Sequence, residues 1–236
     1  MTQEQGTSVR VGPPPVEGVL TRTTNGVYRH LALALSLMVL SAPSVATVML
    51  LAPVGSNAML FVAAQLPVAP ALAAGLYSVR RWREEGDGSP FALFATGLRV
   101  NTLDVLRWWV PALAVGSILA FNIFSGWAVD ALGAAARPVS IVLAVLLILV
   151  CGHALVLTSA FSFRTRDVAR IAVYLLAAQW RTTLAFVSLL IVAGAVTYLG
   201  SEAVLVLSAW VFVSVLELIS RPTVTAIKMR FTASVG

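Results

Sequence analysis

Six stretches of the sequence are long and apolar enough to cross a lipid bilayer as helices. A membrane-spanning helix needs about 20 mostly apolar residues, and in lipid its backbone hydrogen bonds must be made within the segment. We therefore expect an all-α polytopic membrane protein with a single transmembrane domain over residues 28–220. The six predicted transmembrane helices cover residues 28–51, 58–79, 105–127, 139–161, 182–199 and 203–220.

The composition agrees with this class and excludes others. Charged residues make up 11% of the 236 residues and apolar types 59%, whereas an average soluble domain has about 25% charged residues. So little charge does not cover a soluble surface, which excludes a soluble enzyme, a soluble nucleic-acid-binding protein and a disordered chain. The single cysteine, Cys151, excludes a disulfide framework and a metal site built from several cysteines. We expect no metal and no cofactor.

The basic residues predict the orientation. Six spans place both termini on one side of the membrane. Of the 16 basic residues, 15 lie in or beside the two termini and the connections at 80–104 and 162–181, and only Arg137 lies on the opposite side. Because an excess of Lys and Arg marks the cytoplasmic side, we predict cytoplasmic N- and C-termini. The net charge of +6 then follows from topology and contact with anionic lipid, and it does not require nucleic acid.

Polar tails flank the predicted transmembrane domain. Residues 1–27, which include Pro13, Pro14 and Pro15, predict a disordered cytoplasmic tail, and residues 221–236 predict a second cytoplasmic tail. Nearly all basic residues are arginine, which together with the abundant Ala and Val is typical of a GC-rich bacterium. The expected location is therefore the bacterial cytoplasmic membrane.

The connection at 80–104 contains a predicted amphipathic helix. Ser89 and Pro90 form a typical helix start, with a capping residue followed by proline at the first helical position. Phe91 and Phe94 then fall on an apolar stripe, and Arg99 lies off it. Such a helix lies at the membrane surface or docks on the bundle, and we expect it to run into the third span. We treat Phe91, Phe94 and Arg99 as candidate contacts for a cytoplasmic partner, with a simple interfacial anchor as the alternative.

A second short cytoplasmic helix is predicted in the connection at 162–181. Thr165 is placed to cap it, and Asp167 lies in its first turn. Two stripes follow at helical spacing. The polar stripe contains Arg166, Arg170, Tyr174 and Arg181, and the apolar stripe contains Val168, Ile171, Leu175 and Leu176.

Few polar groups lie at membrane depth, and each is a candidate for function. Gln65 precedes Pro67 and Pro70, and prolines interrupt a helix and free backbone carbonyls. His153 lies deep in the fourth predicted span. We expect a proline kink satisfied by its neighbours and a histidine that forms a hydrogen bond between helices. The alternative is a small-molecule pocket between the first, second and fourth spans, lined by Gln65, Tyr77 and His153.

Glu217 lies in the sixth predicted span, one helical turn before Arg221. Residues four apart on a helix are neighbours on its surface, so this spacing predicts an ion pair at the cytoplasmic end of the span.

One segment of about 40 residues carries a family resemblance. It combines an apolar span ending in Leu-Pro, small residues before Leu-Tyr, a basic turn, and a Phe-containing segment with Arg and Asn. These positions are filled by Leu66-Pro67, Pro70-Ala71, Ala74-Gly75-Leu76-Tyr77, Arg80-Arg81-Trp82-Arg83, Phe91, Phe94, Arg99 and Asn101. The segment resembles the YesL-like family of bacterial membrane proteins. The resemblance implies an association with carbohydrate uptake beside ABC importers, but no known activity and no set of binding residues.

The sequence contains no Walker-type glycine loop, no HExxH and no GxSxG. We therefore do not expect an enzyme. The leading hypothesis is an accessory subunit or assembly factor of a carbohydrate ABC importer, with permease or ATPase subunits, or a second copy of the chain, as partners. The alternative hypothesis is a stand-alone small-molecule transporter or channel with its pocket near the proline-broken second span.

Overall fold

The computed structural model describes residues 19–85, 88–124, 131–161, 163–199 and 202–232, and these residues form helices and no strand. The all-helical class predicted from the sequence is therefore confirmed for them. Five stretches are long and apolar enough to cross a membrane: Thr24–Leu50, Gly55–Glu84, Pro90–Phe124, Ala136–Ala160 and Trp180–Leu199. The sixth expected span, 203–220, lies in the last helix, which is not among these five.

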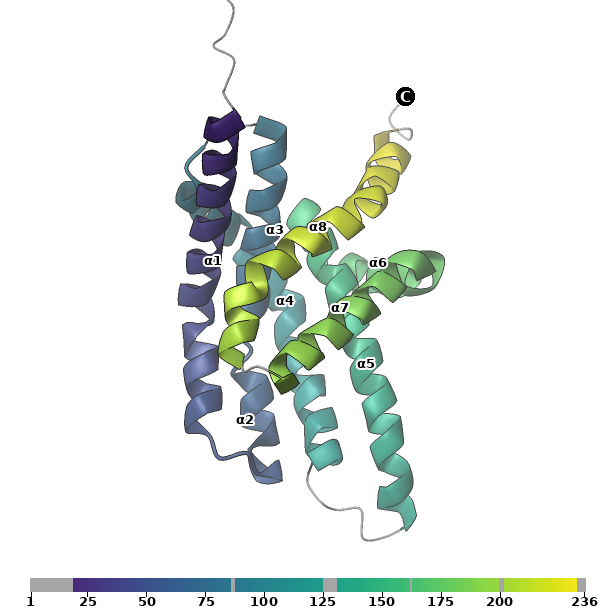
Figure 1. The fold of residues 1–236 in the computed structure, drawn as a ribbon. Coiled ribbons are helices and arrows are strands. Elements are labelled where there is room, and N and C mark those ends of the chain that lie inside the picture. Colours follow the sequence, from purple (N-terminus) through teal and green to yellow (C-terminus); the bar gives the residue numbers. More distant parts are fainter. Residues whose placement is uncertain (1–18, 86–87, 125–130, 162, 200–201, 233–236) are drawn as a thin grey trace, which may run out of the picture.

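Figure 1 shows four helices running alongside one another, α1, α3, α4 and α5, with α7 and α8 crossing them obliquely. The beginning of α1 and the end of α8 lie at the same end of the bundle. The helices are α1 (Val19–Leu50), η1 (Gly55–Asn57), α2 (Ala58–Ala63), α3 (Val68–Glu85), α4 (Pro90–Phe124), α5 (Ala131–Ala160), α6 (Thr165–Ala178), α7 (Trp180–Leu199) and α8 (Glu202–Thr232).

The first and last helices extend into the regions that we expected to be tails. Helix α1 begins at Val19, inside the region 1–27 that we expected to be disordered, and α8 continues past Arg221 and Pro222 to Thr232. The backbone hydrogen-bond ladder of a helix continues beyond the apolar run that crosses the membrane, because polar side chains do not interrupt it. The rest of the predicted tails, 1–18 and 233–236, lies outside the described residues, as does the end of the third expected span.

The first predicted amphipathic helix runs into the third expected span, as predicted, and the two form one element. Helix α4 begins at Pro90, as expected, and continues without a break for 35 residues, or about 52 Å. Its buried positions Pro90, Phe94, Gly97, Asn101 and Val105 follow a spacing of three and four residues. This stripe packs on α3, so the segment is docked on the bundle as an extension of the span.

The short amphipathic helix predicted in the connection at 162–181 is confirmed as α6, and its cytoplasmic location stays a prediction. Val168 and Leu175 are buried, while Arg166, Arg170 and Tyr174 are exposed. The apolar stripe faces the bundle, because α6 contacts α5, α7 and α4. The predicted cap is wrong: Arg164 occupies the N-cap position without a side-chain hydrogen bond, and Thr165 is the first helical residue.

The second predicted span is broken between α2 and α3. The break covers residues 64–67 and ends at Pro67, which has no backbone N–H to donate to the ladder. Turn hydrogen bonds from Gln65 to Val62 and from Leu66 to Ala63 replace the helical ones. A proline interruption is therefore present where the sequence predicted it.

Small residues place α3 at the centre of the bundle. Ala69, Ala71, Ala73 and Ala74 are almost completely buried, and α3 contacts α1, α4, α5 and α8. The closest approach is to α4 at Gly97. A Cβ atom built there would lie 2.9 Å from Cδ1 of Tyr77 and 3.1 Å from the Cα and carbonyl oxygen of Ala74.

We expect Gly97→Ala to destabilise the protein, because the added methyl group forces α4 away from the backbone of α3. The cost should be about 1–3 kcal/mol, measured as a loss of thermal stability of the purified protein in detergent. Gly26→Ala is the control, because a Cβ atom at Gly26 meets nothing within 4 Å. Equal stability of the two variants would contradict the close packing of α3 on α4.

Candidate functional site

A cavity of about 300 Å³ lies beside the break between α2 and α3. Its polar side chains are Ser41, Ser44 and Gln65, and the rest of the wall is apolar. The cavity is lined by Leu37, Ser41, Ser44, Val45, Val48, Gln65, Val68, Leu72, Leu205, Ala209 and Phe212. It therefore lies between α1, α3 and α8.

The backbone carbonyls at the break are used within the chain. Ser44 donates its hydroxyl hydrogen to the carbonyl oxygen of Ala64 at 2.6 Å, and the indole N–H of Trp109 donates to the carbonyl oxygen of Gln65 at 3.2 Å. These bonds satisfy polar groups that would be costly in an apolar environment. The kink satisfied by its neighbours, which we expected, is therefore present.

His153 connects two helices. It is almost completely buried, its Nε2 lies 3.1 Å from Oγ1 of Thr183 on α7, and its ring centroid lies 4.7 Å from that of Phe186. Thr183 donates its only hydroxyl hydrogen to the carbonyl oxygen of Leu176, so the imidazole donates its Nε2 hydrogen to Thr183. The hydrogen bond between helices that we expected for His153 is confirmed.

The structure does not bring the three predicted ligand residues together. Gln65 lines the cavity at the break, and His153 lies between α5 and α7. Tyr77 lies in the middle of α3, and the guanidinium carbon of Arg81 is 5.4 Å from its ring centroid. A ligand-binding role for each residue stays a prediction, but these positions do not form one shared pocket.

The three predicted docking residues also differ in their surroundings. Phe94 is only 7% exposed and belongs to the core that α3 and α4 share. Phe91 is 44% exposed and Arg99 is also exposed. Only Phe91 and Arg99 therefore present a surface to a partner, because the ring of Phe94 is used in holding α4 on α3.

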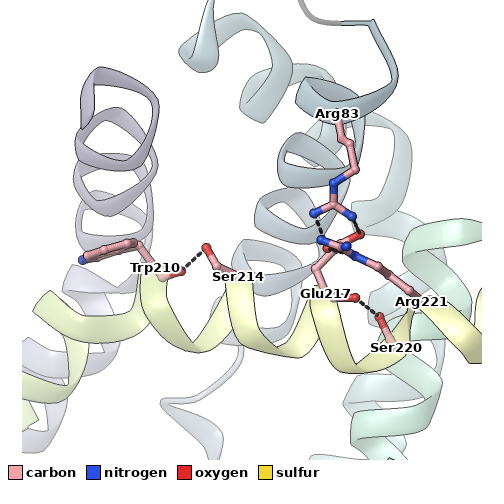
Figure 2. Close-up of polar contacts among 6 residues, drawn as sticks. All are labelled: Arg83, Trp210, Ser214, Glu217, Ser220 and Arg221. Carbon is pink, nitrogen blue, oxygen red and sulfur yellow. Dashed lines mark hydrogen bonds and ion pairs between the residues drawn. The ribbon is translucent and has the colours of Figure 1, made fainter. Parts of the chain in front are cut away.

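A buried carboxylate is held by two arginines. Figure 2 shows Glu217 on α8 between the side chains of Arg83 and Arg221. Glu217 is only 3% exposed. The Nη1 and Nη2 groups of Arg83 donate to its two oxygens at 3.1 and 3.0 Å, and Nε of Arg221 donates at 3.2 Å. The two-bond contact with Arg83 is the strong geometry for a guanidinium and a carboxylate.

The sequence predicted only half of this cluster. The pair between Glu217 and Arg221 is confirmed, and its signal was the spacing of four residues. Arg83 lies 134 positions from Glu217, and no local pattern connects the two. The only available signal was the basic run at the end of α3, which we assigned to orientation and to the family resemblance.

Residues of α3, α4, α5, α7 and α8 line an apolar groove of about 270 Å³. Trp108, Phe186 and Phe212 are among the side chains that line it. Helix α7 packs loosely: 11% of its apolar stretch is buried, against 39% for Gly55–Glu84. One face of α7 therefore has few contacts within the chain.

Among the described residues, no group of three His, Cys, Asp or Glu side chains is arranged to hold a metal ion. Comparisons with family models, curated proteins and solved structures gave no match to this chain.

We expect Glu217→Gln to destabilise the protein by about 1–3 kcal/mol, because the neutral amide no longer accepts charged hydrogen bonds from both arginines. Thermal unfolding in detergent measures the loss. Asp104→Asn is the matched control, because its pair with Arg107 lies on the surface and should contribute at most about 1 kcal/mol. A larger loss for the control would contradict the central role of Glu217.

Proposed function

We propose that this chain is a non-catalytic integral membrane protein that acts as an accessory subunit or assembly factor of a carbohydrate ABC importer. Two features support the proposal. The segment from Leu66 to Asn101 resembles the YesL-like family, and α7 presents an unpacked outer face. The partners would be permease or ATPase subunits of the importer, with a second copy of the chain as the alternative.

The proposal includes six spans with both termini in the cytoplasm of a bacterium. Helix α8 supplies the sixth span. An even number of spans is supported by the common position of the start of α1 and the end of α8 at one end of the bundle. The uneven distribution of basic residues supports a cytoplasmic assignment for that end.

The outer face of α7 is the observation that carries the proposal. Leu184, Ile191 and Tyr198 are 53%, 66% and 89% exposed. Gly194 lies in the same helix, and a Cβ atom there would meet nothing within 4 Å. Glycine in a helix interior costs about 1 kcal/mol relative to alanine, and no close contact within the chain explains it here. In membranes, glycine permits close approach of a partner helix.

We expect Gly194→Leu to reduce recovery of importer subunits about tenfold, which corresponds to 1.4 kcal/mol of lost packing. The measurement is affinity purification of the tagged full chain from native membranes in mild detergent, followed by quantitative mass spectrometry. Gly26→Leu is the matched control, because the same side chain enters open space on α1. Recovery of the chain alone, or only with copies of itself, would contradict the accessory role.

The cavity beside the proline break favours a second candidate function, a stand-alone small-molecule transporter or channel. It measures about 300 Å³, the lower end of the size range of small-molecule sites. Ser41, Ser44 and Gln65 provide its polar groups.

If this second function is correct, proteoliposomes that contain only this protein should take up a radiolabelled sugar. Gln65→Leu should reduce the uptake about tenfold, because it removes a polar contact in the cavity. Thr197→Val is the control, since Thr197 lies on α7 and donates to Ala193. Uptake no faster than in empty liposomes would reject this candidate.

A further inference from the structure

Two adjacent cavities lie at the end of the bundle where α3 ends. One measures about 190 Å³ and includes Arg83, Glu217 and Arg221 in its wall. The other measures about 230 Å³ and includes Tyr77, Arg81 and Ser159. Arg80, Glu84 and Val224 belong to both walls. We call the two cavities together the arginine site.

Arg80 is the one arginine that lines both cavities. Its Nη1 group donates to the carbonyl oxygen of Ser159 at 2.8 Å, in the last turn of α5, where the helix dipole favours a positive charge. Its Nη2 group is buried and meets no hydrogen-bond acceptor among the described residues. A buried guanidinium donor without an acceptor is unfavourable, so the position calls for an oxygen-bearing group.

The walls of the arginine site carry an excess of positive charge. They contain four guanidinium groups and two carboxylates, which gives a formal charge of +2. Glu217 already accepts hydrogen bonds from both Arg83 and Arg221. The carboxylates therefore do not balance the arginines, and an anion is the complementary ligand.

We infer that the arginine site binds a phosphate group, with Arg80 as the central donor. The planar guanidinium matches the geometry of phosphate oxygens, and a phosphate offers several acceptors to donors that converge from different helices. Both cavities are smaller than the sites of drug-sized ligands, which suits a headgroup or a small phosphate compound. The inference goes beyond the accessory role and does not depend on an importer.

The phosphate group could belong to either of two ligands, an anionic phospholipid or a soluble phosphate. The site lies at the end of the apolar stretch Gly55–Glu84, the depth at which lipid headgroups lie, and basic pockets between transmembrane helices bind phospholipid headgroups. The experiment compares the two sources directly.

The experiment measures binding to the full chain in detergent by native mass spectrometry and by thermal shift. The probes are phosphatidylglycerol, phosphatidylcholine and inorganic phosphate. We expect Arg80→Lys, which keeps the charge but loses the planar fork, to weaken phosphatidylglycerol binding about tenfold. Arg170→Gln, which removes an exposed arginine of α6, should leave that binding unchanged.

Arg81→Gln is the second variant, because Arg81 is half-buried and lines the larger cavity, so its loss spares the hydrogen bond of Arg80 to α5. It should weaken the same binding several-fold. Binding of phosphatidylglycerol that depends on Arg80 and Arg81 supports the lipid source. Stabilisation by inorganic phosphate without lipid, with the same dependence, supports the soluble source. Equal binding by the wild type and all three variants overturns the inference. The inference is also overturned if Arg170→Gln loses as much phosphatidylglycerol binding as the Arg80 and Arg81 variants.

Discussion

The close packing around α3 is the constraint on which the rest of the structure depends. In lipid, helices gain little from hiding apolar surface from one another, because the surrounding chains are as apolar as the side chains. What holds them together is van der Waals contact at short distance, and small residues permit it. Ala69, Ala73 and Ala74 are almost completely buried, and α1, α4, α5 and α8 all contact this one helix.

The central position of α3 also determines where the polar chemistry lies. Arg80 and Arg83 occupy the last turns of α3, so their guanidinium groups emerge between the neighbouring helices instead of on an outer face. Arg80 therefore reaches the last turn of α5, and Arg83 reaches Glu217 on α8. The small residues lie in the first half of α3 and the arginines in its last turns, so the charged groups meet their partners at one end of the helix.

The properties that follow from local sequence could be predicted, and those that depend on packing could not. Apolar runs predicted the helices, and helical spacing predicted the two faces of α6. A spacing of four residues predicted the pair between Glu217 and Arg221. Local sequence also predicted that the amphipathic segment after Ser89 and Pro90 runs into the third span, and α4 is continuous from Pro90 to Phe124. Two features depend on how distant segments pack together: the contact of Arg83 with Glu217, and the separate positions of Gln65, Tyr77 and His153. Local sequence spacing does not predict such packing.

The two helices of the α7–α8 hairpin are held unequally. Helix α8 is fixed to α3 by a two-bond ion pair between the half-exposed Arg83 and the buried carboxylate of Glu217, and by packing of Val213 near Gly75. Helix α7 contacts α8 and α6 and makes a smaller contact with α5, where His153 is bonded to Thr183. Since α8 is the fixed member, a helix that packs on α7 would meet a face whose position is set by α8. A group bound at the arginine site would contact the residues that hold α8 in place. Both proposed sites therefore depend on the position of α8.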